Sequence, residues 1–402
     1  MPATQLSHPL FESDNRHPIS LPTFTPANIT QDMIGQAVHF AELPNDPIKF
    51  YGTPKPLLLE YRLLSRRASV IRDVTVQTAR LLDEAAQKSS KDTRIAITGS
   101  SGSGKSVLLL QAVRYCLEND WVVIYIPRAK STVNSTTTHT YDLRTRTYLQ
   151  PEYASQILRR ILGVNSKLLS DINTKQSLSL ERRQIPAGTS LSELATIGVK
   201  EQQLATVILD ALMNELSAQK KYPVLLAIDD FQAIYKERTI YRDPHFAHIR
   251  PYHLSMPRLL LEFASGQRVF SQGAVLGAVT NTDPLFPISN ELMWALGTER
   301  IHPTSPYDKM NKTLVEYTAG LKNLEVPAQF SLPEASAVFE VWMKDRAVSA
   351  PINDELFLSK YTESGGHPRS FVWKGLLATL DGEIPKYDPE VPWPQLREAV
   401  VV

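Results

Sequence analysis

A glycine- and serine-rich octapeptide lies at residues 99–106 of this 402-residue chain. Its residues are, in order, Gly99, Ser100, Ser101, Gly102, Ser103, Gly104, Lys105 and Ser106. The order fits the pattern G-x-x-x-x-G-K-[ST], in which glycines let successive backbone N–H groups converge on an anion. The helix that follows such a loop adds the positive end of its dipole. The octapeptide therefore predicts a P-loop that holds the phosphates of a nucleotide.

The flanks of the octapeptide have the character that this loop requires. Residues 94–98 form a short apolar strand pattern, and residues 105–119 form a helix pattern. Continuous apolar runs at 121–126, 224–229 and 273–280 are typical of strands buried on both faces. The sequence therefore predicts an α/β P-loop NTPase fold, a parallel sheet with helices on both faces.

The ligand expected in the loop is a purine nucleotide, ATP or GTP or the corresponding diphosphate, with Mg²⁺. Lys105 is expected to neutralise the β- and γ-phosphates, and the Ser106 hydroxyl to ligate Mg²⁺. No Asn-Lys-x-Asp element, which would read guanine, occurs in the sequence. The identity of the base therefore stays open at this point.

Two aspartates close the apolar run at 224–229. Asp229 is expected at the carboxyl end of its strand beside the P-loop, where it would hold Mg²⁺ through water. Asp230 could orient an attacking water as a general base. Since a strand that ends in two aspartates also describes a solvated turn, the pair supports metal binding better than hydrolysis.

Two later positions are candidates for phosphate contacts. Asn281 or Thr280 follows the last apolar strand and could reach the γ-phosphate, although an Asx turn before Pro284 explains them equally well. Arg369 follows Gly-His-Pro at the start of the last predicted helix and could approach the phosphates. An exposed arginine at a helix start is the alternative interpretation.

Proline spacing and helical periodicity predict the division of the chain. Nine prolines in residues 1–56 predict an extended N-terminal arm whose order depends on a partner. Residues 57–319 are predicted to form the nucleotide-binding domain, beginning with a helical stretch at 57–86. A Thr- and Ser-rich loop or hairpin is inserted near 128–150, and residues 320–402 form a small helical lid and a tail.

Charge and apolar composition limit the partners. The formal net charge is +1, from 43 Lys plus Arg and 42 Asp plus Glu. Because this balance excludes a broad positive field, any RNA contact must be local. Arg144 and Arg146, which alternate with tyrosines, are candidates for such a contact or for a protein contact, and a solvated hairpin is the alternative. No apolar run approaches the roughly 18 residues of a membrane helix, so no membrane partner is expected.

Two further features concern the compartment. The single cysteine, Cys116, excludes an intrachain disulfide and is expected to be a small core residue. The first thirty residues contain one basic residue, Arg16, and so lack the arginine-rich pattern of an organelle transit peptide. Either the protein has no such signal or the signal is missing from this sequence.

The order of these parts resembles the death-associated protein 3 family, P-loop proteins of the mitochondrial ribosomal small subunit. The resemblance rests on the P-loop, the strand ending in Asp229-Asp230, the Leu-Gln-Pro-Glu-Tyr-Ala-Ser segment at 149–155, and the 273–280 strand, which follows Pro-Arg-Leu-Leu-Leu at 257–261. It covers about residues 35–380.

The resemblance implies a P-loop core similar to that of AAA+ and related STAND-type signalling ATPases. It implies a place in the head of the small subunit, in the mitochondrial matrix, with protein neighbours, limited rRNA contact and bridges to the large subunit. Since no arginine finger can be named, slow or no hydrolysis is expected.

Two other functions are weighed against the structural role. One is an ATPase or GTPase that switches protein partners on hydrolysis, with Asp230 as base and Arg369 as sensor. The other is a metabolic kinase, which is disfavoured because no acceptor-binding constellation is present.

Overall fold

The computed structural model describes residues 19–180, 183–298, 309–345, 347–348 and 353–379. Its strands are β1 Ala37–His39, β2 Ala68–Val70, β3 Arg94–Thr98, β4 Val122–Ile126, β5 Thr140–Asp142, β6 Thr147–Leu149, β7 Leu178–Leu180, β8 Arg183–Ile185, β9 Val224–Asp229, β10 Gly273–Ala278 and β11 Lys322–Glu325. Its α-helices are α1 Pro47–Tyr51, α2 Lys55–Leu63, α3 Asp73–Ala85, α4 Lys105–Glu118, α5 Pro151–Ser170, α6 Leu191–Lys200, α7 Ala205–Ala218, α8 Ser255–Ser265, α9 Asn290–Leu296, α10 Lys312–Thr318, α11 Leu332–Lys344, α12 Asp354–Ser364 and α13 Pro368–Ser370, which a π-helical stretch, Phe371–Leu376, continues.

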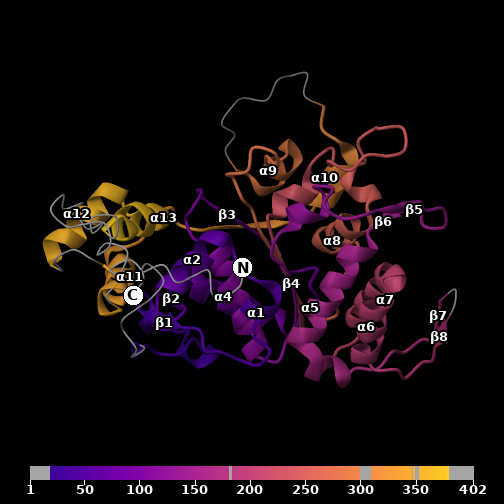
Figure 1. Ribbon diagram of the computed structural model, residues 1–402, viewed down its shortest axis with the longest axis horizontal. Helices are drawn as coiled ribbons and strands as arrows, with labels where there is room; N and C mark the ends of the chain where they lie inside the picture. The colour runs from indigo at the N-terminus through magenta and orange to yellow at the C-terminus, as the bar shows by residue number, and fades with distance from the viewer. Residues whose placement is uncertain (1–18, 181–182, 299–308, 346, 349–352, 380–402) are drawn as a thin grey trace, which may run out of the picture.

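A five-stranded parallel sheet forms the centre of the molecule, with strand order β11-β3-β10-β9-β4 (Figure 1). Strand β10 lies between β3, which precedes the P-loop, and β9, which ends at Asp229. Ala278 of β10 is in register with Ile97 of β3 on one side and with Asp229 on the other. The three strands therefore end at the same level, and the residues that follow them meet at one edge of the sheet.

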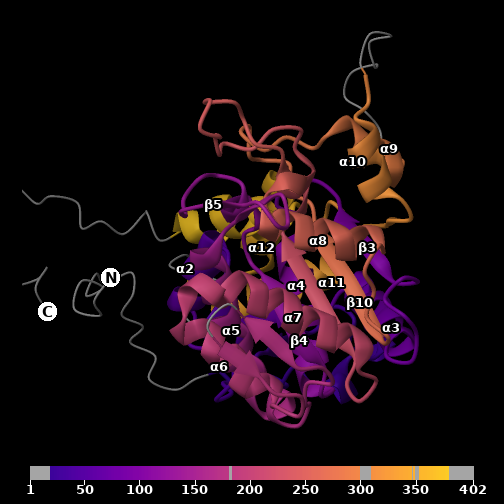
Figure 2. The same ribbon diagram turned by 90° about the vertical axis from the view of Figure 1, so that its right-hand side faces the viewer.

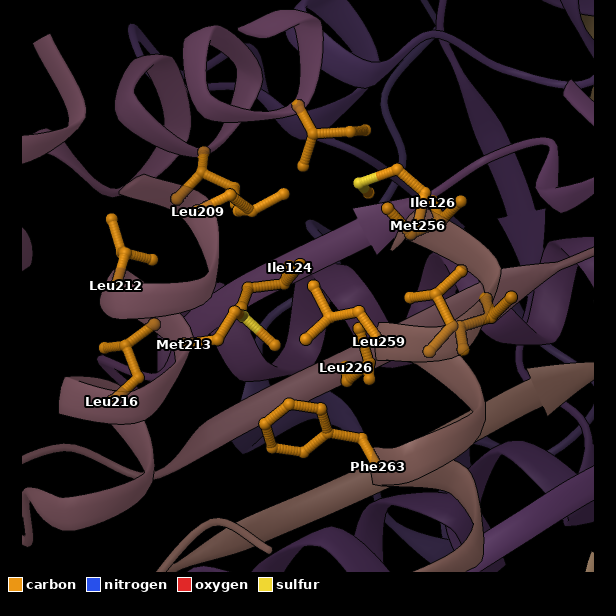
Figure 3. Close-up of a cluster of buried hydrophobic side chains, with 14 of the residues drawn as sticks. Ile124, Ile126, Leu209, Leu212, Met213, Leu216, Leu226, Met256, Leu259 and Phe263 are labelled. Carbon is orange, nitrogen blue, oxygen red and sulfur yellow. The ribbon is translucent and has the colours of Figure 1, made fainter. Parts of the chain in front are cut away.

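Side chains alternate between the two faces of the sheet, and helices cover both. Leu225 and Ala227 of β9 pack with α3 and α4, whereas Leu226 and Ile228 pack with α5, α7 and α8. Figure 3 shows the second face, where residues of β4 and β9 meet α7 and α8. Because both faces are covered, the strands read as continuous apolar runs. This arrangement is the predicted P-loop NTPase fold.

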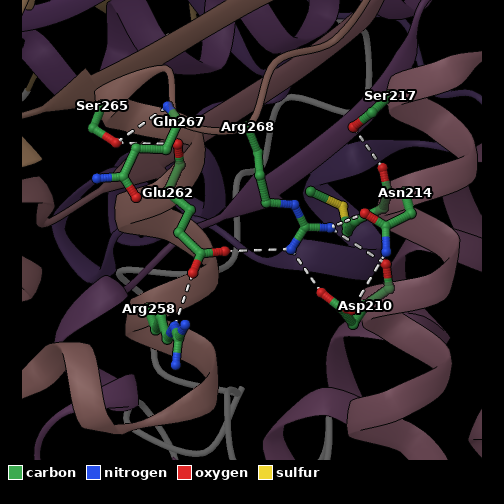
Figure 4. Close-up of polar contacts among 9 residues, drawn as sticks. Asp210, Asn214, Ser217, Arg258, Glu262, Ser265, Gln267 and Arg268 are labelled. Carbon is green, nitrogen blue, oxygen red and sulfur yellow. Dashed lines mark hydrogen bonds and ion pairs between the residues drawn. The ribbon is translucent and has the colours of Figure 1, made fainter. Parts of the chain in front are cut away.

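A polar cluster joins α7 to the segment after α8 at the molecular surface (Figure 4). The Arg268 guanidinium contacts Asp210 at 2.6 Å, Asn214 Oδ1 at 2.7 Å and Glu262 at 3.5 Å. Arg258 forms a second ion pair with Glu262, at 2.8 Å. These contacts hold the two helices together at the rim of the apolar core of Figure 3.

The outer strand β4 is covered by side-chain amide and hydroxyl groups. Asn165 accepts a hydrogen bond from Val123 N and donates one to Val123 O, both at 2.8 Å. Tyr51 of α1 also donates to Val123 O, at 2.9 Å. Asn165 has non-helical backbone angles inside α5, which is the local distortion that lets its side chain reach the strand.

The C-terminal lid packs beside the N-terminal segment, on one side of the sheet (Figures 1 and 2). Phe339 and Trp342 of α11 form a small core with Phe371, Leu63 and Leu64. The lid begins at α11, later than the predicted residue 320, because β11 pairs with β3 and belongs to the sheet. The residues from 380 onward, including the predicted tail, lie outside the described residues.

The N-terminal segment differs from the prediction in two ways. From residue 19 it lies against its own chain as short 3-10 turns, β1 and α1, with Phe24 and Tyr51 buried. The prolines break helices but leave room for these apolar anchors. The stretch 57–86 is two helices separated by β2, which pairs antiparallel with β1. Residues 1–18 lie outside the described part of the chain.

The insertion after β4 contains an antiparallel hairpin of β5 and β6. Tyr141 is half exposed at its surface and contacts Tyr148 with the rings tilted by 57° and their centroids 5.0 Å apart. A second small hairpin, β7 and β8, projects on the same side of the sheet as α6 and α7 (Figure 1).

Cys116 is buried within α4. Within the described ranges, every helix is too short or too polar to cross a membrane.

Candidate functional site

The octapeptide forms the turn from β3 into α4, as predicted. Gly99, Gly102 and Gly104 have φ values of +135°, +84° and +104°, in the region that side chains other than glycine rarely adopt. A Cβ on Gly102 would lie 2.7 Å from Arg369 Cβ and 2.8 Å from His367 Cε1. The absence of a side chain at Gly102 therefore lets the lid approach the loop backbone.

Lys105 is buried at the first position of α4. Its Nζ donates to the carbonyl oxygens of Gly99 and Ser100, at 2.9 and 2.6 Å. Burial lowers the pKa of this ammonium to about 8, and the negative charge of Asp229 partly opposes the shift. The loop thus holds a buried cation whose hydrogen bonds go to backbone carbonyls.

Two serine hydroxyls of the loop support a phosphate-binding role. The Oγ atoms of Ser100 and Ser103 are buried and have no hydrogen-bond partner among the residues that the structure describes. Buried polar atoms in proteins are nearly always satisfied, so such atoms call for an explanation. Unpaired hydroxyl donors beside a buried ammonium and the amino end of a 14-residue helix fit a bound oxyanion.

Asp229 ends β9 and Asp230 follows it, and both line the same cavity as the loop. Asp229 is 4% exposed and accepts a hydrogen bond from Asp230 N at 2.9 Å. Burial raises the pKa of the Asp229 carboxyl to about 7 and the neighbouring charge of Asp230 adds to the shift, whereas the nearby Ser106 side chain lowers the pKa. A neighbouring hydroxyl and carboxylate are ligands suited to Mg²⁺.

Asp230 has a left-handed backbone, with φ of +56°. Its carboxylate forms an ion pair with Lys130 Nζ at 3.5 Å. The same ammonium contacts Asp283 Oδ2 at 3.4 Å. The general base that the sequence suggests is therefore engaged by a lysine that sequence reasoning missed.

Asn281 and Thr280 follow β10, between the loop and Asp230. The Asn281 Nδ2 donates to the Gly99 carbonyl at 3.2 Å. The Thr280 backbone N–H donates to Gln232 Oε1 at 2.9 Å, and both residues line the same cavity as the loop. The structure therefore places Asn281 beside the glycine-rich loop.

The lid contacts the loop through the start of α13. His367 Nε2 lies 2.7 Å from the Ser101 carbonyl oxygen, and Arg369 N donates to the Gly102 carbonyl at 3.3 Å. The Arg369 side chain lines the cavity, and its charge acts on the carboxyl of Glu60. Of this motif, the sequence prediction named Arg369 and overlooked the imidazole, which makes the shorter contact.

Arg72 is a second residue that sequence reasoning missed. Its guanidinium donates to the Ser103 carbonyl at 2.8 Å and to Gln329 O at 2.8 Å, and it pairs with Glu334 of α11 at 3.2 Å. Arg72 and Glu334 are both buried. One side chain thereby joins the P-loop to the lid, although no sequence pattern around residue 72 signals it.

A cavity of about 580 Å³ extends from the loop to an apolar wall. Leu57 and Tyr61 of α2 line one side of this wall, and Trp342 and Val372 of the lid line the other. Glu60 contributes a carboxylate, which accepts a hydrogen bond from Trp373 Nε1 at 2.8 Å. The cavity therefore combines a polar end for an anion with an apolar slot for a flat ring.

The carboxyl group of Glu60 predicts a pH dependence of stability. Burial raises its pKa from the ordinary 4.5 to about 6, against the Trp373 hydrogen bond and the charge of Arg369, which lower it. Between these two values the folded protein binds more protons than the unfolded chain, so the contribution of Glu60 to stability is lost as the pH rises.

Glu60→Gln keeps an oxygen for Trp373 but cannot ionise. At about pH 7.5 we expect the free energy of unfolding of the variant to exceed that of wild type by up to about 2 kcal/mol. At about pH 4 we expect the two values to be equal. Urea denaturation at both pH values measures this. An equal difference at the two pH values would show that ionisation is not the cause.

Comparison with known proteins adds to this geometry. The model of the family described as mitochondrial ribosomal death-associated protein 3 matches residues 69–373. The small ribosomal subunit protein mS29 of Neurospora crassa is 29% identical over 370 residues, which are 89% of this chain and 78% of that protein. The protein of the same name from Schizosaccharomyces pombe is 25% identical over 305 residues, 75% of this chain and 62% of that protein.

Among solved structures, the chain is similar to the Aeropyrum pernix ORC2 protein in its ADP form, with a TM-score of 0.37, 14% identity, and coverage of 82% of this chain and 67% of that one. The family match spans the P-loop, both aspartates, the lid contacts and all five strands of the parallel sheet. The chain belongs to the mitochondrial ribosomal death-associated protein 3 family.

Proposed function

We propose that this protein is a structural component of the small subunit of the mitochondrial ribosome, in the mitochondrial matrix, and that it holds a purine nucleotide with Mg²⁺. The family match and the names of the relatives support the ribosomal assignment. The place of the phosphate-binding loop at the polar end of a nucleotide-sized cavity is the observation that supports the ligand.

Different residues of the cavity can bind different parts of the nucleotide. The loop amides and Lys105 would hold the β- and γ-phosphates, and Ser106 and Asp229 would hold Mg²⁺, which offsets the phosphate charge. The apolar slot between α2 and the lid would take the base, with the Glu60 carboxylate as an acceptor for an N–H of the ring. ATP, GTP and the diphosphates all meet these requirements.

Slow or no hydrolysis is part of the proposal. A general base must be free to accept the proton of the attacking water. The Asp230 carboxylate is instead paired with Lys130. A held nucleotide would then act mainly on stability, since a ligand at a thousandfold excess over its dissociation constant adds about 4 kcal/mol.

The partners proposed are small-subunit proteins, with limited rRNA contact and bridges to the large subunit. The net charge of +1 supports a peripheral position. Leu143, in the turn between β5 and β6, is 81% exposed, and Phe246, in the loop between β9 and α8, is 77% exposed. These two side chains are available for contacts with neighbouring proteins.

One observation favours the second function, a nucleotide-dependent switch of partners. His367 and Arg369 N contact carbonyl groups of the loop itself, so a change in the loop would reach the lid directly. Steady-state turnover separates the two functions. The structural role predicts negligible turnover in wild type, whereas the switch predicts turnover that Lys105→Ala and Asp230→Asn abolish.

The experiment that tests the ribosomal assignment is sedimentation of mitochondrial extract containing tagged protein. We expect the protein in the small-subunit fraction, and mass spectrometry of the small molecules released from that fraction on denaturation should identify one purine nucleotide per copy. Absence of the protein from the particle would overturn the ribosomal assignment. A particle that contains the protein but no nucleotide would overturn the ligand.

A further inference from the structure

Lys130 occupies a position in the cavity that the nucleotide-binding residues named so far do not explain. It lies in the 3-10 turn Ala129–Thr132 that follows β4, at the far end of the strand order from the P-loop. Its side chain nevertheless reaches back across the strand ends to Asp230, which follows β9, and to Asp283, which follows β10. Lys130 lines the same cavity as Lys105 and Asp229.

The neighbours of Lys130 place it at the outer end of the phosphate site. The Asp229 carboxyl lies near Lys105 and Ser106 of the P-loop, which act on its pKa, and the next residue, Asp230, contacts Lys130. Asp229 therefore connects the P-loop side of the cavity with the side that holds Lys130. A phosphate chain that starts in the P-loop and reaches past the metal site ends near the Lys130 ammonium.

The charges around this position favour such a contact. Asp230 and Asp283 would repel the γ-phosphate of a triphosphate, which a diphosphate lacks. The Lys130 ammonium lies between these two carboxylates, at 3.5 and 3.4 Å. An ammonium has three N–H donors, so two carboxylates leave one for a phosphate oxygen. Its side chain is 35% exposed, which leaves it accessible from the cavity.

We propose that Lys130 is the residue that distinguishes a nucleoside triphosphate from a diphosphate in this site, by neutralising Asp230 and Asp283 and donating to the γ-phosphate. This inference rests on the proposed nucleotide binding. It assigns to the turn after β4 a contact that depends on the γ-phosphate, whereas Lys105 serves both ligands. A merely structural clamp between the three loops would affect both ligands equally.

The test measures the affinity of the full-length protein for ATP, GTP, ADP and GDP with Mg²⁺ by calorimetry, using non-hydrolysable triphosphate analogues in parallel. In Lys130→Met we expect triphosphate affinity to fall about tenfold or more and diphosphate affinity to change less than about threefold. Lys130→Arg should retain most of the preference. Lys236→Met is the matched control, because Lys236 donates to the nearby Leu285 carbonyl but does not line the cavity.

A second variant makes the test independent of the folding of Lys130→Met. Asp283→Asn removes one repelling charge and leaves Lys130 in place, so triphosphate affinity should rise relative to diphosphate affinity. Equal effects on both ligands in these variants would overturn the role of Lys130 and leave nucleotide binding intact. Failure of wild type to bind any of the four nucleotides would overturn the proposed ligand itself, and the inference with it.

Discussion

Lys105→Ala is expected to weaken the binding of Mg²⁺-nucleotide by about 100-fold or more while the protein stays folded. Lys105 is 7% exposed, and its ammonium hydrogen-bonds to backbone carbonyls of the loop. Burial without a hydrogen-bonded carboxylate makes the charge costly in the free protein, as the lowered pKa of Lys105 shows. Charge-assisted contacts with phosphate oxygens would offset that cost. Removing Lys105 should therefore weaken nucleotide binding and leave the fold intact.

Thermal unfolding with and without nucleotide measures this effect. Wild type should gain several degrees at saturating nucleotide, and Lys105→Ala should gain far less at the same concentration. Lys88→Ala provides the control, since Lys88 is exposed, does not line the cavity and pairs with Glu84 at 3.3 Å. If Lys105→Ala keeps the full nucleotide-induced rise in unfolding temperature, Lys105 is not part of the binding site.

Arg72→Ala is expected to lower the free energy of unfolding by about 3–5 kcal/mol. The substitution leaves the buried Glu334 carboxylate without its ion-pair partner. It also removes the donors to the Ser103 and Gln329 carbonyls and the cation contact with the Phe330 ring, 5.2 Å from its centre. The lid should therefore separate from the P-loop before the sheet unfolds.

Urea denaturation of three variants separates the effect of the unpaired Glu334 charge from the effect of the other contacts that Arg72 makes. Arg72→Met combined with Glu334→Gln removes both charges and should recover more than half of the loss, because no uncompensated charge stays buried. Arg268→Ala, in the more exposed cluster of Figure 4, should cost only about 1 kcal/mol. If the double variant were as unstable as Arg72→Ala, the buried carboxylate would not be the cause.

The central part of the fold could be predicted because its signals are local. The glycines of the P-loop, the apolar run before Asp229 and the run that begins at Gly273 each follow from a few adjacent residues. The edge strand β11 was missed because its sequence, Lys-Asn-Leu-Glu, has one apolar residue. It is held by backbone pairing with β3, which no short pattern reveals.

The candidate site was predictable to a different degree. Motif spacing named Lys105, Ser106 and Asp229, and the structure brings all three to one cavity, because each stands at the end of a strand or the start of a helix. Their roles in binding stay predictions. Lys130 and Arg72 escaped because their partners are about 100 and 260 positions away along the sequence. Long, flexible side chains acquire such partners only when the loops are folded together.

The side-chain amide of Asn165 has a consequence for how the protein joins an assembly. By bonding both backbone groups of Val123, it occupies the place that an incoming strand would take at that border of the sheet. At the opposite border, β11 offers four residues with charged Lys322 and Glu325 exposed. Neighbouring molecules cannot easily lengthen this sheet, so docking must use side chains displayed on its loops and helices.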